Sequence, residues 1–514
     1  MSSKIDAANK LASDLNFVNT SDNPDKACQG LKPDVGVYHS SRTPNRITDF
    51  SKMEFWVEFK YNADHDAFRD TDKPNETSDG SDEFSHFEHN SQQSRLTRGQ
   101  IASYAAAQLG TQFRTHVFSL LICGSFARFI RWDRASAIVS ERFDYEEDDH
   151  YLAEFISRYS LQDHGGVDAS VSPADSYETK LAMEHLACQA EEYLKLMVPR
   201  GSDSNVPRWG SYVISYPQYL SRSPFGRATR SFFAYDIVNK KQVFIKDYWR
   251  VDEPGMEKEG DIYAELKKHD VRHIPSFDCG GDVYHHHTLA HTLKQNRWGR
   301  RKNDIPCYRH YRMALSSVFR DLLSFQSSWE YVKAVADAME GEVLIFACLP
   351  CIWAYFCTLT AHDDAYFKAG ILHRDISVGN IMLGENGEGI LIDWDQSVKV
   401  GNLQSFARRP GRTVSAYSSL CVFRFAQIYD RGPGNLFQGN CSPPAVNMIS
   451  KTTANPFYGS CYGYLCVSLS MTRHPPTLLE LWNCSTRRST QQMEFVAGDS
   501  KSLLSYLQTA YHTE

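Results

Sequence analysis

Five residues between positions 373 and 393 have the types and the spacing that phosphoryl transfer requires. His373, Arg374 and Asp375 are consecutive, Asn380 lies five residues after Asp375, and Asp393 lies thirteen residues after Asn380. The chemistry needs a carboxylate near the incoming hydroxyl group and oxygen ligands that hold Mg²⁺ against the phosphates of ATP. The pattern H-R-D-x-x-x-x-N followed by a metal-binding Asp meets both needs.

We therefore predict that His373, Arg374 and Asp375 form a catalytic loop in which Asp375 is the base. Asn380 and Asp393 are the predicted Mg²⁺ ligands. The alternative is a salt-bridged loop aspartate that has no catalytic part.

A hairpin is needed to bring the second aspartate back beside the loop. Residues 381–383 (IML) and 390–392 (ILI) are apolar, and the segment 384–389 between them (GENGEG) is rich in turn-forming residues. The sequence therefore predicts two short strands joined by a turn, with Asp393 directly after the second strand.

A second set of residues, upstream, is predicted to hold the phosphates of ATP. The segment 243–246 (VFIK) has the form of a strand whose final lysine contacts the α and β phosphates. Strands are predicted over 232–237 and 242–245, and a helix over 257–268. Glu259 is expected to pair with Lys246, because Ile262 and Leu266 place it at the edge of a buried face. The alternatives are a surface lysine with a solvated glutamate, or a pair between Lys246 and Asp393.

The candidate phosphate-covering loop is the segment 223–230, SPFGRATR. Gly226 is its one glycine, so a close approach of the backbone to phosphate depends on this residue. Arg227 or Arg230 could supply additional positive charge. The alternative is an ordinary hairpin turn.

The N-terminal part predicts an α/β unit with its own set of polar residues. Strands are expected over 55–60, 115–123 and 127–132, with a helix over 98–109. Asp34, Glu58 and Lys60, followed by Gln100 and Tyr104, reproduce the order P-D, E-x-K, Q-x-x-x-Y that is seen in restriction-endonuclease-like folds. Two carboxylates could hold a divalent cation there while the lysine orients water or phosphate. A noncatalytic accessory domain is the alternative.

Composition limits the class of protein. The chain has 514 residues and a formal net charge of −7, with 13 cysteines. This charge argues against a protein whose main role is to coat nucleic acid or an anionic membrane. The scattered cysteines, and an N-terminus without an apolar leader, favour an intracellular setting. The apolar run 343–359 is short for a membrane span and contains Pro350, so a buried segment is expected and a membrane location is not.

The predicted domain order follows from shifts in composition. An N-terminal α/β accessory domain is expected over 1–165, with an acidic linker near 64–93, and a further linker over 166–209. Strand-rich sequence over 210–300 and helix-containing sequence over 301–514 follow, and the segment 413–470 lacks clear periodicity.

Several segments together resemble the fungal-type protein kinases. They are LKPDVGVY, RGQIASYAAAQL, FSLLICGSFARFIRWDR, SPFGRATR, VFIKDYWR, EGDIYAEL, IPSFDCGGDV, RHYRMAL, GILHRDISVGNIML and LIDWD, within roughly residues 30 to 400. The resemblance implies an α+β, two-lobed protein-kinase-like fold behind the accessory domain, with its N-lobe over 210–300 and its C-lobe over 301–514. It also implies transfer of the ATP γ-phosphate to Ser or Thr of a protein substrate. By this resemblance the functional residues of the family correspond to Lys246, Asp375, Asn380 and Asp393.

Three departures from the family pattern qualify this expectation. Ser377 stands where many such kinases have a lysine, Trp394 and Asp395 replace Phe-Gly, and no kinase pattern follows Thr413. We therefore expect a weak or inactive kinase in this form. A small-molecule kinase related to the aminoglycoside and choline kinases, or a nucleotide-binding scaffold without turnover, are the alternatives.

Two other features are expected to be structural. His285, His286 and His287, with His291, suggest a metal site, but neighbouring strand residues point to opposite faces. The basic segment 297–302 (RWGRRK) is expected to be a solvated loop.

Overall fold

The computed structural model describes residues 12–42, 48–70, 87–148, 150–161, 165–186, 192–201, 208–215, 223–295, 305–316, 319–327 and 360–402, with shorter pieces elsewhere. They form a mixed α+β protein, as predicted, with several sheets and few helices. The chain divides into two compact units. The first comprises 1–261, 276–318 and 492–514, and the second comprises 262–275 and 319–491. Among the described helices, none is both long enough and apolar enough to cross a bilayer.

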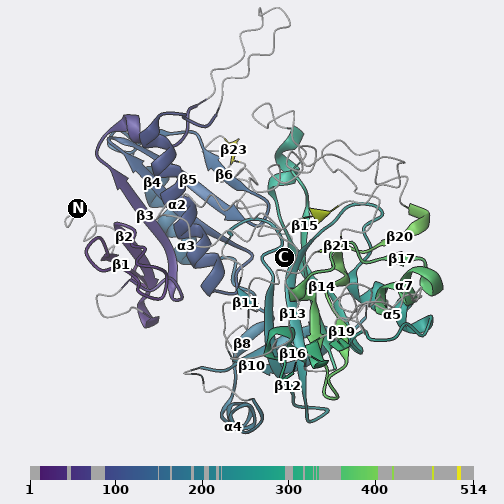
Figure 1. Cartoon of the computed structure of the whole chain (residues 1–514). Helices are drawn as coiled ribbons and strands as arrows, with labels where there is room; N and C mark the ends of the chain where they lie inside the picture. Colours follow the sequence, from purple (N-terminus) through teal and green to yellow (C-terminus); the bar gives the residue numbers. More distant parts are fainter. Residues whose placement is uncertain are drawn as a thin grey trace, which may run out of the picture. The chain divides into compact units, whose positions relative to one another are not determined.

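The N-terminal sheet of the first unit has eight strands (Figure 1). They are β1 (Leu15–Asn19), β2 (Val35–His39), β3 (Met53–Lys60), β4 (His116–Cys123), β5 (Phe126–Asp133), β6 (Ala137–Ser140), β7 (Phe143–Asp144) and β23 (Phe495–Gly498). The order is β1-β2-β3-β4-β5-β6-β23, and β7 pairs with β5. Strands β3 and β4 are parallel, and helix α2 (Gln92–Thr111) lies between them in the chain. Parallel neighbours need such a crossover connection.

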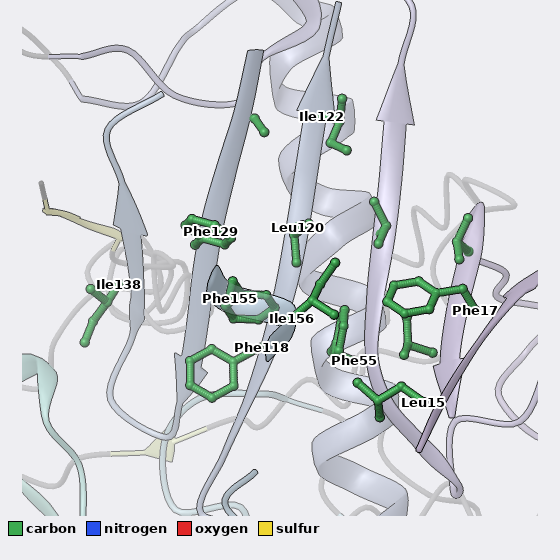
Figure 2. Close-up of a cluster of buried hydrophobic side chains, with 14 of the residues drawn as sticks. Leu15, Phe17, Phe55, Phe118, Leu120, Ile122, Phe129, Ile138, Phe155 and Ile156 are labelled. Atoms are coloured by element: carbon green, nitrogen blue, oxygen red, sulfur yellow. The ribbon is translucent and has the colours of Figure 1, made fainter. Parts of the chain in front are cut away.

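Alternation along the strands gives this sheet two buried faces. On one face Phe55, Phe118 and Phe129 pack with Phe155 and Ile156 of helix α3 (His150–Leu161), as Figure 2 shows. The opposite face packs against α2; its strand residues include Trp56, Leu121 and Trp132, and its helix residues Ile101, Ala105 and Leu109. Both faces are apolar because a helix covers each one.

The second sheet of the first unit also has eight strands. They are β8 (Val171–Pro173), β9 (Leu194–Pro199), β10 (Trp209–Ile214), β11 (Tyr219–Leu220), β12 (Arg230–Asp236), β13 (Lys241–Val251), β14 (Phe277–His287) and β15 (Tyr308–Leu315). The order is β14-β15-β13-β12-β10-β9-β8, and β11 pairs with β12. Helix α4 (Ser176–His185) begins with a capping box between Asp175 and Glu178, and α5 (Glu259–Lys268) follows β13 in the chain. The core residues on these strands include Leu196, Ile214, Phe232, Ile245 and Ala314.

The structure corrects two of the predicted boundaries. The segment 166–209, predicted as a linker, contributes β8, α4 and β9, and β9 pairs with β10 along six residues from Leu194 to Pro199. The boundary predicted at 300 separates β15 from its sheet, although β15 pairs with β13 from Phe244 to Val251. The compact units divide at 261 and 318 instead.

Both ends of the predicted acidic linker near 64–93 make defined contacts. Phe68 and Phe87 stack with ring centroids 5.2 Å apart, and Ser91 caps α2 by accepting from the Ser94 N–H. Residues 71–86 between them lie outside the described part of the chain, as do the segments 297–302 and 343–359 and all of 413–470 except two short strands.

The second unit contains helix α7 and small sheets. Its elements are β16 (Arg320–Asp321), α7 (Thr360–Ala369), β17 (Ile371–Leu372), β18 (Ile381–Leu383), β19 (Gly389–Leu391), β20 (Val398–Lys399), β21 (Leu420–Cys421) and β22 (Cys466–Val467). The predicted hairpin is present, with β18 pairing antiparallel to β19 from Ile381↔Leu391 to Leu383↔Gly389. Arg272 binds Asp364 of α7 at 2.8 Å, which joins the segment 262–275 to this helix.

Candidate active site

The first unit places Lys246 and Glu259 in a buried ion pair. Lys246 lies on β13 with 7% of its surface exposed, and Glu259 is the first residue of α5 with 1% exposed. The Lys246 Nζ is 2.7 Å from Glu259 Oε2 and 4.6 Å from the centroid of the Tyr248 ring. The predicted pair is therefore confirmed, and the alternative of a surface lysine with a solvated glutamate is wrong.

Close packing at the start of α5 fixes the position of the glutamate. The Gly260 N–H donates to the Tyr311 hydroxyl at 3.1 Å. A Cβ atom at Gly260 would crowd the side chains of Tyr311 and Phe277, so glycine allows the first turn of the helix to approach the sheet. The backbone of Lys246 is fixed by the sheet, because Lys246 on β13 lies opposite Met313 on the neighbouring strand β15.

In the second unit, His373 connects the predicted catalytic loop to the end of β19. Its Nε2 lies 2.9 Å from the carbonyl oxygen of Ile392, and its Nδ1 accepts from the Asp375 N–H at 3.2 Å. These partners require the tautomer with the proton on Nε2. The ring is fully buried and packs edge-on against Trp394, with centroids 4.6 Å apart. His373, predicted as catalytic, is thus a positioning residue.

Asp375 and Asn380 lie together, as predicted. The Asn380 Nδ2 donates to the Asp375 carbonyl at 2.7 Å and lies 3.4 Å from its Oδ2. The Gln396 Nε2 donates to the same Oδ2 at 3.2 Å. Since the amide nitrogen of Asn380 makes both contacts, its Oδ1 is the atom left for a cation. Carbonyl and carboxylate oxygens are the ligands that Mg²⁺ prefers.

Asp393 and Arg374 have left-handed backbones, with φ of 67° and 71°. Asp393 follows β19, and the Ile392 N–H just before it donates to the Asn380 carbonyl at 2.9 Å. This bond ties the second predicted Mg²⁺ ligand to the first. Left-handed conformations of such residues cost on the order of 1 kcal/mol each and are found mainly at functional sites. The Arg374 side chain is exposed, and its catalytic part stays a prediction.

Gly226 does not support the predicted phosphate contact. It has a φ of 88°, as a glycine turn requires, but its N–H donates to the Arg134 carbonyl at 2.8 Å. The adjacent Phe225 stacks on Trp132 with ring centroids 6.3 Å apart. The loop is therefore packed on the N-terminal sheet, and the Gly226 amide is already engaged.

Arg230, predicted as an additional phosphate-binding charge, is engaged in the same region. Its NH2 donates to the carbonyls of Leu109 and Gln112 at 2.6 and 2.7 Å, and its guanidinium lies 4.8 Å from the Phe113 ring centroid. Only 6% of the residue is exposed. The phosphate-binding part of Arg230 stays a prediction, but its guanidinium makes contacts that the spacing of the loop does not reveal.

Sequence reasoning missed a buried polar network in the first unit. One ligand atom each from Asp168, His286 and His310 lies within 4.8 Å of the others, a geometry that could hold a metal ion. However, Arg312 already binds Asp168 at 2.9 Å, and Asp247 contacts His310 at 2.5 Å. Existing partners account for these groups, so we regard the network as structural. Asp168 lies far from the histidines in the sequence, and no local signal could have found it.

The model of the fungal protein kinase family matches residues 67–346 and 354–417, and the chain belongs to this family. The match begins inside the N-terminal region, is interrupted within the apolar run 343–359, and ends shortly after Thr413. No curated protein matches the chain. Membership of a protein kinase family supports phosphotransferase chemistry with ATP.

Proposed function

We propose that the protein is an ATP-dependent kinase that phosphorylates Ser or Thr hydroxyls of a protein substrate. The oxygen of the substrate hydroxyl bonds to the γ-phosphorus of ATP, and Asp375 accepts the proton of that hydroxyl. The bond between the γ-phosphorus and the oxygen of the β-phosphate breaks, and ADP leaves. Lys246 holds the phosphates of ATP and is itself held by Glu259. Asn380 and Asp393 are the residues that hold Mg²⁺, which supplies neutralising charge on the phosphates.

The contacts around Asp375 are the main support for this proposal. Asn380 and Gln396 both donate to its carboxylate, and its backbone is fixed by His373. A base whose position is fixed before substrate binds loses little entropy in the reaction. A loop aspartate without a function would not need contacts from three separate positions.

We also propose the two-lobed kinase arrangement, with revised bounds. The sheet containing β13 and β15, together with the start of α5, is the N-lobe, and the second unit contains the C-lobe. In the order β14-β15-β13-β12-β10-β9-β8, the lysine strand β13 lies between β15 and β12, and Lys246 is buried.

Two alternatives differ in the acceptor. A small-molecule kinase is suggested by Trp394, which is fully buried and fixed by a 3.0 Å hydrogen bond from its Nε1 to the Leu391 carbonyl. This tryptophan replaces the phenylalanine of the usual motif, as it does in the aminoglycoside and choline kinase relatives. A scaffold would bind ATP without turnover.

Transfer of labelled phosphate distinguishes these classes. Purified protein is incubated with labelled ATP and Mg²⁺, in parallel with a generic protein substrate, with choline and with an aminoglycoside. We expect label on protein Ser or Thr, and none when Asp375→Asn replaces the wild type. Label on the small molecules would favour the first alternative, and binding of ATP without any transfer would favour the second.

A further inference from the structure

A second set of chemical groups lies in the N-terminal sheet, in residues that the proposed kinase reaction does not use. Strands β2 and β3 are antiparallel, with Val35 opposite Val57. Asp34 therefore lies opposite Glu58, and directly opposed residues of antiparallel strands share one face of the sheet. The Phe59 N–H donates to Asp34 Oδ2 at 2.8 Å, which holds this carboxylate at β3.

Lys60 lies on the same face of β3, two residues after Glu58. Its Nζ contacts Glu58 Oε1 at 2.6 Å and donates to Gln100 Oε1 of α2 at 2.8 Å. Gln100 in turn donates to the Tyr104 hydroxyl at 2.7 Å, and that hydroxyl donates to the Lys32 carbonyl at 2.5 Å. This chain of hydrogen bonds fixes the ammonium group beside the two carboxylates.

One oxygen of the site has no protein partner. The Glu58 side chain is 3% exposed, and its Oε2 is buried and accepts no hydrogen bond from the residues that the structure describes. Leaving a buried charged oxygen without a partner is costly.

A purely structural ion pair does not account for this arrangement. One ammonium group faces two carboxylates, so the site lacks one positive charge. A divalent cation would supply it, and would give Oε2 the partner that the described residues do not provide. Carboxylate oxygens are the ligands that Mg²⁺ and Mn²⁺ prefer.

We propose that Asp34 and Glu58 bind a divalent cation of the Mg²⁺ class and that, together with Lys60, they form a site for phosphodiester hydrolysis. The cation and the ammonium group bind the anionic phosphate oxygens. The oxygen of a water molecule then bonds to phosphorus and the bond from phosphorus to the alcohol oxygen breaks. The water loses one proton to solvent and the leaving oxygen gains one, so that a diester and water give a monoester and an alcohol.

Cation binding is tested in the full chain carrying Asp393→Asn, which removes a proposed kinase cation ligand. Calorimetric titration with Mn²⁺ is carried out for this protein and after addition of Asp34→Asn or Glu58→Gln. Both substitutions keep the size of the side chain and an oxygen acceptor. Asp64→Asn, at an exposed residue that follows β3 in the chain, is the matched control.

We expect the affinity for Mn²⁺ to fall at least about tenfold in the Asp34 and Glu58 variants and to stay unchanged in the control. Thermal unfolding midpoints near that of the parent protein show that the variants are folded. Equal affinity in all folded variants would overturn the proposed site, and if either variant does not fold, the other one decides the result.

Hydrolysis is tested on supercoiled plasmid DNA with Mn²⁺ or Mg²⁺. We expect nicking by the Asp393→Asn protein, and at least about a hundredfold slower nicking after Asp34→Asn or Lys60→Met. Mn²⁺ binding without nicking would overturn the hydrolytic part of the proposal. Because the kinase substitution is present throughout, failure here leaves the proposed kinase function unaffected.

Discussion

Arg312 shows how a single buried residue can connect distant parts of a sheet. Its side chain is fully buried on β15 and binds Asp168 at 2.9 Å and Asp247 at 3.0 Å. It also donates to the Ser170 hydroxyl and the Met197 carbonyl. Burial raises the pKa of Asp168, but Arg312 acts together with His286, His310 and the Ser170 hydroxyl to outweigh it, and the pKa is lowered to about 2.

We predict that Arg312→Leu lowers the free energy of unfolding by about 3–5 kcal/mol, since it leaves two buried carboxylates uncompensated. Arg309→Leu, on the same strand but with its side chain 41% exposed, should cost about 1 kcal/mol or less. Urea denaturation of both variants measures the difference. Equal losses would mean that the buried network contributes nothing beyond a surface pair.

His286 predicts a pH dependence of stability. Burial first, and then the nearby His310 and Arg312, lower its pKa to about 4 from its usual 6.5, against the opposing effect of Asp168. Between these values the unfolded chain binds a proton that the folded chain does not. Acidification therefore favours unfolding, and the stability present above pH 6.5 declines as the pH falls towards 4.

We expect the free energy of unfolding to be on the order of 1–2 kcal/mol lower at pH 5 than at pH 8 through this residue. His286→Asn should make the profile flatter, while His287→Asn, at an exposed position of the same strand, should keep it. Denaturation at a series of pH values tests this. Identical profiles for the two variants would contradict the assignment.

Asp393, as a proposed metal ligand, leads to a specific prediction for nucleotide binding. We expect Asp393→Asn to weaken Mg²⁺-ATP binding at least about tenfold, because an amide cannot replace the negative charge of a metal ligand. The binding of ATP without Mg²⁺ should change little, which serves as the control. Calorimetry that finds the same Mg²⁺-ATP affinity in variant and wild type would remove Asp393 from the metal site.

The spacing of residues in the sequence predicted contacts correctly where the partners lie near one another along the chain. Asp375 and Asn380 are five residues apart, and the Lys246–Glu259 pair followed from one strand and the next helix. The phosphate-binding parts of Gly226 and Arg230 stay predictions, because the Gly226 amide donates to Arg134 and the Arg230 guanidinium donates to Leu109 and Gln112 at the end of α2. His373 was correctly placed in the loop, but only its burial shows that it positions Asp375.

Among the secondary-structure elements, the β18–β19 hairpin was predictable because turn residues separate two apolar runs. Strands β8 and β9 were not, since β8 is only three residues long and largely exposed, and β9 is interrupted by Lys195. The pairing of β8 with β9, and of β9 with β10, depends on contacts that composition does not encode. The pairing of β15 with β13 was not predictable either, because the two strands lie far apart in the sequence.

The hairpin offers a test of this packing. A Cβ atom at Gly389 would overlap the backbone carbonyl of Ala334, whereas Gly401 has open space around it. We predict that Gly389→Ala lowers stability by about 1–3 kcal/mol through overpacking and slows phosphate transfer by displacing Asp393. Gly401→Ala should affect neither stability nor turnover. Thermal unfolding and transfer assays of both variants provide the comparison, and wild-type behaviour of Gly389→Ala would contradict the described packing.

At the scale of the whole molecule, the N-terminal sheet and the lysine-bearing sheet belong to one compact unit. The family match likewise begins at residue 67, within the N-terminal region. The predicted accessory domain therefore stays a prediction, although its sheet is not a separate compact unit. Arg134 and Arg230 show the physical reason, since both place buried side chains between the two sheets.

This arrangement bears on the expected turnover. A phosphate loop whose Gly226 amide is engaged, and a serine at 377 in place of a cation, both reduce the positive charge available to the transferring phosphoryl group. We therefore expect the protein to be a slow kinase. The rate should fall below the range of about 1–100 per second that is typical of protein kinases.

The most direct test is the steady-state rate of phosphate transfer from ATP to a generic protein substrate and to the protein itself, measured with and without Mg²⁺. We predict Mg²⁺-dependent transfer at less than about one per second, and its loss in Asp375→Asn, with the unfolding midpoint unchanged. Transfer that persists in folded Asp375→Asn, or the absence of any transfer by the wild type, would contradict the proposed catalytic role of Asp375.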